Sequence, residues 1–113
     1  MAIDLNKKTG NIIGKLINRI RLANTFQWQK NFSKSNLIFN EIEEELSCIE
    51  KGSFKNYEDF LFQHIGKNKF DQNNYEEALY YFNKAIMIRL EKGDQELIDS
   101  TNLAINTVRN KLK

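Results

Sequence analysis

Apolar residues recur along this 113-residue chain at steps of three and four, and the chain contains no proline. Such steps place side chains on one face of an α-helix. Because proline is the residue that most strongly ends or kinks a helix, its absence leaves little to interrupt long helices. A β-strand would instead show apolar residues at every second position, and no such alternation occurs. We therefore predict an all-α fold.

The spacing predicts about five antiparallel helices joined by short loops. Asp94 is expected to cap the start of the fifth helix, Asn56 that of the third, and Ser33 or Ser35 that of the second. Gly93 is expected to end the fourth helix, because glycine readily adopts the left-handed conformation found after helix ends. The predicted helical segments are residues 11–29, 33–53, 56–70, 75–92 and 95–113.

The length and composition predict one helical domain over residues 1–113. A chain of this size can form a single modest core. Its 41% hydrophobic and 28% charged residues are typical of globular proteins. We expect residues 1–52 to form an N-terminal helix pair of unclear type, either a degenerate repeat or a separate helical cap. Residues 54–113 form a second helical part.

The chain is expected to be cytoplasmic and not embedded in a membrane. No apolar run approaches the roughly 20 residues that span a bilayer, and the opening stretch MAIDLNKKTG lacks the apolar core of a signal peptide. The single cysteine, Cys48, cannot form an intramolecular disulfide. We expect Cys48 to pack as a small apolar residue, because no base or metal partner is evident.

No catalytic, metal or cofactor site is expected. His64 is the only histidine, so no site that needs two imidazoles can form. The consecutive residues Glu43, Glu44 and Glu45 would point in three directions on a helix and do not converge on a metal. The five glycines are scattered and form no phosphate-binding loop. These observations predict a protein that is not an enzyme.

The stretch from Phe62 to Ile88 carries a more specific pattern than an apolar stripe. Gly66 and Ala78 are small enough for two antiparallel helices to approach closely, Phe82 can fill the space beside them, and Ala85 leaves room for a following helix. The whole pattern consists of Phe62, Ile65, Gly66, Tyr75, Ala78, Phe82 and Ala85. It resembles the tetratricopeptide repeat, a helix–turn–helix unit of about 34 residues.

The resemblance covers roughly residues 60–108, with one clear repeat. Two features depart from the family pattern: Lys69 stands where tyrosine is usual, and no proline ends the second helix. The resulting long helix, followed by a short loop and another helix, is similar to the extended repeats of the kinesin-light-chain type. Residues 54–113 are thus expected to form a tetratricopeptide-like helix pair and a C-terminal capping helix.

The resemblance implies a non-catalytic adaptor or assembly subunit that binds a peptide or helix of a partner protein. Such repeats bind on a concave face lined mainly by the first helix of each pair. Here Phe60, Gln63, Lys67 and Phe70 would line that groove. Alternatively, Phe60 and Phe70 pack against residues 11–50. Because one repeat is too few to bury its own faces, a homo-oligomer is also considered.

A second hypothesis is a small basic helical protein that binds nucleic acid through its N-terminal segment. Basic residues interleaved with aromatic ones suit a surface that follows a phosphate backbone. The acidic residues of 41–50 would partly cancel its field, and the net charge of the chain is only +2. The candidate patch consists of Lys15, Arg19, Arg21, Trp28 and Lys30, with Lys7 and Lys8 upstream.

Overall fold

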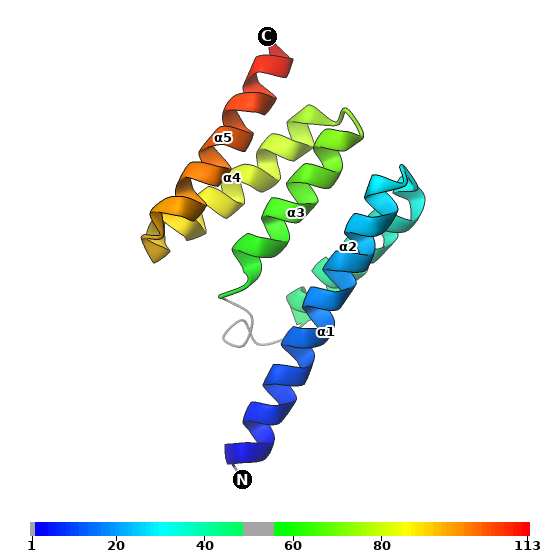
Figure 1. Cartoon of the computed structure of the whole chain (residues 1–113), viewed down its shortest axis with the longest axis vertical. Helices are drawn as coiled ribbons and strands as arrows, with labels where there is room; N and C mark the ends of the chain where they lie inside the picture. Colours follow the sequence, from blue (N-terminus) through cyan, green and yellow to red (C-terminus); the bar gives the residue numbers. More distant parts are fainter. Residues whose placement is uncertain (1, 49–55) are drawn as a thin grey trace. The chain divides into compact units, whose positions relative to one another are not determined.

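The computed structural model describes residues 2–48 and 56–113, and the side chains of residues 13–46 and 56–113. Within these ranges the chain forms five helices and no strand, which confirms the predicted all-α fold (Figure 1). The helices are α1 (Ala2–Trp28), α2 (Phe32–Cys48), α3 (Glu58–Asp71), α4 (Tyr75–Lys92) and α5 (Gln95–Leu112). None of these helices is both long and apolar enough to cross a membrane.

The chain divides into two compact units, which we call the N-terminal unit (Met1–Lys55) and the C-terminal unit (Asn56–Lys113). This division lies close to the predicted boundary between residues 52 and 54. That the whole chain forms one domain stays a prediction.

The N-terminal unit is an antiparallel pair of helices, α1 and α2 (Figure 1). The turn between them contains Lys30 in the left-handed conformation, with φ 61°. The amide N–H of Lys34 then donates to Oδ1 of Asn31 at 3.4 Å. Asn31 is therefore the residue that caps α2. The predicted caps were wrong, because α2 begins at Phe32 and places both Ser33 and Ser35 inside the helix.

Buried apolar residues of the N-terminal unit lie at helical steps on both helices, as the spacing indicated. The first helix starts earlier than predicted, at Ala2 and not at residue 11. Among the side chains of this unit that the structure describes, the buried apolar ones are Leu16, Ile20, Ala23, Phe39 and Ile42.

The C-terminal unit contains α3, α4 and α5, each antiparallel to the next (Figure 1). Two predicted helix ends are confirmed: Gly93 follows α4 in the left-handed conformation with φ 76°, and the Asp94 side chain accepts from the Leu97 N–H. The predicted Asn56 cap was wrong. The residue before α3 is Tyr57, and no side chain caps this helix.

The core of the C-terminal unit forms where α3 and α4 approach closely. A Cβ atom added at Gly66 would lie 2.6 Å from Cε1 of Phe82, so only glycine fits beside this ring. Apolar residues of α4 and α5 continue the core. Its buried cluster is Ala78, Phe82, Ile105 and Val108, with Phe70, Tyr75, Leu79, Ile86 and Ala104 packed around it.

Candidate functional site

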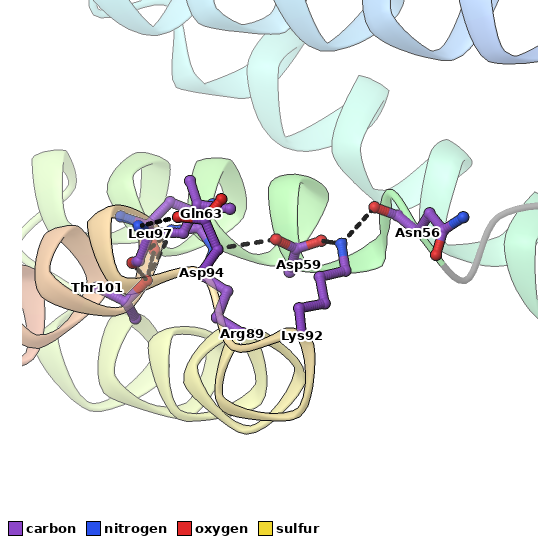
Figure 2. Close-up of polar contacts among 8 residues, drawn as sticks. All are labelled: Asn56, Asp59, Gln63, Arg89, Lys92, Asp94, Leu97 and Thr101. Atoms are coloured by element: carbon purple, nitrogen blue, oxygen red, sulfur yellow. Dashed lines mark hydrogen bonds and ion pairs between the residues drawn. The ribbon is translucent and has the colours of Figure 1, made fainter.

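A buried polar network joins the three helices of the C-terminal unit (Figure 2). At its centre, Nε of Arg89 in α4 lies 3.0 Å from Oδ2 of Asp59 in α3, and these side chains are 5% and 4% exposed. The Lys92 ammonium donates to the other carboxylate oxygen, Oδ1, at 2.6 Å. It also donates to the carbonyl oxygen of Asn56 at 2.6 Å. One carboxylate thus forms ion pairs with two cationic side chains of α4.

The same arginine connects the network to α5. Nη1 of Arg89 donates to Oγ1 of Thr101 at 2.7 Å and to the carbonyl oxygen of Leu97 at 3.3 Å. The Thr101 hydroxyl lies 3.1 Å from both Oε1 of Gln63 and the Leu97 carbonyl oxygen, and can donate to either. Arg89 therefore holds α5 against the α3–α4 pair through two acceptors.

Two titratable groups of α3 have shifted pKa values. Burial by itself would raise the pKa of Asp59. The hydrogen bonds and the charges of Lys92 and Arg89 outweigh this effect and hold the pKa below its ordinary value of 3.8. Burial lowers the pKa of His64 to about 4, helped by the charges of Lys67 and Arg89. At neutral pH the network therefore contains a carboxylate, and the imidazole beside it is neutral.

The chemistry of this network is structural. Its central ion pair is buried, and each of its charged groups already has internal partners. Across the part of the chain that the structure describes, no three His, Cys, Asp or Glu residues lie close enough to hold a metal ion. The network thus positions the three helices of the C-terminal unit.

The four predicted groove residues have different surroundings on α3. Gln63 is 4% exposed and bonded to Thr101, and Phe70 packs at the edge of the core with its ring 5.3 Å from that of Tyr75. Lys67 is exposed. Phe60 is half-buried, and its ring meets the imidazole of His64 edge-on at 4.4 Å. Two of the four are thus used inside the C-terminal unit.

The residues of the repeat-like pattern lie in and beside the α3–α4 contact. The Phe62 ring is half-buried, at 6.2 Å from the ring of Tyr81. Tyr75 is half-buried next to Phe70. The remaining residues of the pattern are buried: Ile65, Gly66, Ala78, Phe82 and Ala85.

The candidate nucleic-acid patch is divided in the structure. Arg19 forms ion pairs with Glu41 and Glu45 of α2, so acidic side chains neutralise its charge. Trp28 is 77% exposed. The remaining members of the patch are exposed: Lys15, Arg21 and Lys30. The side chains of Lys7, Lys8 and Cys48 lie outside the residues that the structure describes.

Sequence reasoning missed the polar network, although one signal was present. Ala78, Phe82 and Ala85 define the buried stripe of α4, and the next position on that stripe is Arg89. A charge on a buried stripe requires a partner of opposite charge. The spacing alone does not identify Asp59 as that partner, because Asp59 lies on another helix.

Comparison of the chain with protein-family models, curated proteins and solved structures found no match.

Proposed function

We propose that this chain is a non-catalytic adaptor or assembly subunit that binds a peptide or a helix of a partner protein. The observation that supports this function is the close contact of α3 and α4, where Phe82 packs directly against Gly66. Ala78 and Ala85 are fully buried on the same helix as Phe82. Together with the antiparallel α5, this is the arrangement that the tetratricopeptide resemblance implies, and repeats of that kind act by presenting a binding surface.

In this proposal Lys67 and Phe60 contact the ligand. Lys67 carries an exposed charge, and Phe60 offers part of an aromatic surface beside His64. Aromatic residues are common anchors of protein interfaces. Gln63 and Phe70 instead support the surface from inside. Phe60 and Lys67 are seven residues apart and share one face of α3. Such a face favours a ligand segment that carries an apolar and an acidic side chain.

Capture from a native lysate tests the proposal. The bait is the full chain, compared with a Phe60→Ala/Lys67→Glu variant and with a matched control, Leu103→Ala/Lys111→Glu, which changes exposed residues of α5. Proteins retained by the parent are identified by mass spectrometry and titrated by calorimetry. We expect the α3 variant to bind at least about tenfold more weakly, and the control to bind like the parent. Equal binding by all three chains would reject the proposed surface.

A second copy of the chain is one partner of this kind. A single repeat leaves helix faces without a neighbouring repeat. Size-exclusion chromatography with light scattering over a range of concentrations distinguishes a 13.3 kDa monomer from an oligomer.

The nucleic-acid hypothesis keeps one supporting observation, the exposure of Trp28 together with Arg21 on α1. These residues are seven apart and share a helical face. Binding to labelled single-stranded DNA and RNA would be measured from low to moderate salt. A nucleic-acid binder should lose affinity steeply as salt rises, and Trp28→Ala should weaken it. No binding at low salt would end this hypothesis.

A further inference from the structure

Three aromatic rings surround one ammonium group on the α3–α4 pair. The Lys84 Nζ atom lies 4.6 Å from the ring centroid of Tyr80, 5.0 Å from that of Phe62 and 5.8 Å from that of Tyr81. The Tyr80 and Tyr81 rings are 5.2 Å apart and nearly perpendicular, at 80°. We call the three rings the aromatic box. Their arrangement gives three walls around a single cation position.

The aromatic box lies on a different side of α3 from the surface proposed above. Phe62 is two residues after Phe60, which places it about 200° around the helix. Tyr80, the most open wall, is 55% exposed. Solvent thus reaches the box from its Tyr80 side, and a ligand could enter there without disturbing Phe60 or Lys67.

The ammonium in the box is held by rings and not by an acid. Lys69, Arg89 and Lys92 each have a carboxylate oxygen within 4.0 Å. Among the described residues, no carboxylate oxygen lies within that distance of the Lys84 ammonium. The negative faces of aromatic rings attract cations without accepting conventional hydrogen bonds. The box therefore stabilises positive charge mainly through its ring faces.

This chemistry selects among cationic ligands. Unmethylated ammonium and guanidinium groups, that of Lys84 included, carry N–H donors, and a ring face satisfies these donors less well than an oxygen acceptor does. A quaternary ammonium has no N–H donor, and aromatic cages are a known way to bind it. We propose that the aromatic box binds a quaternary ammonium group of the kind carried by an Nε-trimethyl-lysine side chain, and that Lys84 occupies the box when no ligand is bound. This site is independent of the proposed partner surface.

Occupation by Lys84 sets the expected affinities. The Lys84 side chain competes with any external ligand. Only the fraction of molecules in which Lys84 has left the box can bind, so the apparent affinity of the parent chain is reduced. Removing this side chain empties the box permanently. We expect the Lys84→Ala variant to bind the ligand about fivefold to tenfold more tightly than the parent.

Nuclear magnetic resonance tests the proposal with N-acetyl-Nε-trimethyl-lysine amide as the probe and the full chain as the protein. Ring currents should move the trimethylammonium proton signal upfield on binding, most strongly with Lys84→Ala. Lys84→Gln, which keeps a longer stem, replaces that variant if its helix content falls. Adding Tyr80→Ala should abolish the shift, whereas Lys67→Ala, a change at an exposed lysine outside the box, should leave it unchanged.

A neutral tert-butyl analogue of the probe separates attraction of charge from apolar contact. The proposal expects the analogue to bind much more weakly than the trimethylammonium compound. It is wrong if the two bind equally, or if a folded variant lacking Lys84 shifts the probe signal no more than the parent does. Phe60→Ala/Lys67→Glu should bind the probe like the parent, so failure of the partner surface and failure of the aromatic box are distinguishable.

Discussion

At the scale of single residues, the charges of the C-terminal unit determine which side chains must stay together. Arg89 is 4% exposed, and a buried guanidinium is tolerated only when its charge and its N–H groups have partners. Asp59 supplies the charge, and oxygens of α5 supply acceptors. Loss of one partner should therefore cost far more than loss of an exposed ion pair.

We expect Asp59→Asn to lower the free energy of unfolding by about 3 kcal/mol, because it leaves the buried charge of Arg89 uncompensated. The matched control is Glu45→Gln, which removes the pair between an exposed carboxylate and a half-buried Arg19 that still pairs with Glu41, and which should cost about 1 kcal/mol or less. The double variant Asp59→Leu/Arg89→Met, which removes both charges of the buried pair, should lose less stability than Asp59→Asn. Urea unfolding followed by circular dichroism measures all three variants and the parent. Equal costs for Asp59→Asn and Glu45→Gln would show that the network does not stabilise the fold.

We expect Gly66→Ala to destabilise the chain despite alanine's higher helix propensity. The new methyl group would meet Phe82, which is 2% exposed and has little room to move. Overpacking costs about 1–3 kcal/mol, and helix propensity offsets up to about 1 kcal/mol. At Gly14 a Cβ meets nothing within 4 Å, so Gly14→Ala should stabilise its helix by up to about 1 kcal/mol. Amide hydrogen exchange would measure the stability of each unit separately. A change of stability with the same sign in both variants would contradict the packing argument.

At the scale of elements, α4 is the helix on which the C-terminal unit is organised. It packs against both α3 and α5, and its buried stripe alternates small, aromatic and charged residues. Small residues allow close approach, the aromatic ring fills the core and the arginine bonds to both neighbours. The helix thus tolerates little change in volume along this stripe.

Enlarging the small residues of α4 tests this role. Ala78→Leu and Ala85→Leu place a large side chain at positions with no exposed surface, and each should cost roughly 1–3 kcal/mol. Asn83→Leu changes an exposed position of the same helix and should alter stability by no more than about 0.5 kcal/mol. Thermal unfolding compares the three variants. If Ala78→Leu and Ala85→Leu melt like the parent, α4 is not closely packed.

At the scale of the whole molecule, acid should weaken the fold through two residues of α3, His64 and Asp59. The pKa of His64 is about 4 in the fold, against 6.5 for an ordinary histidine. As the pH falls, the unfolded chain therefore protonates His64 before the folded chain does. The contribution of His64 to the free energy of unfolding is fully present above pH 6.5 and decreases towards pH 4. The stability that Asp59 contributes is lost at lower pH, as the pH falls below 3.8, the ordinary pKa of aspartate, because the pKa of Asp59 in the fold lies under that value.

We expect the parent to lose at most about 3 kcal/mol of stability through His64 as pH falls from about 7 to about 4. His64→Gln, which cannot take up the proton, should show a smaller loss over the same range. Urea unfolding at several pH values measures the difference between the two chains. Parallel pH profiles for the parent and His64→Gln would contradict the shifted pKa.

The sequence by itself determined the all-α class, the five helices and the ends marked by Gly93 and Asp94. These features depend on periodicity and on local backbone preferences, which neighbouring residues establish. Only the tertiary structure decided that Arg89 pairs with Asp59, that Gln63 turns inward to Thr101 and that Phe62, Tyr80 and Tyr81 surround Lys84. Three of these contacts join residues on different helices. Their partners are selected by how the helices pack, and a helical repeat specifies only the face on which each residue lies.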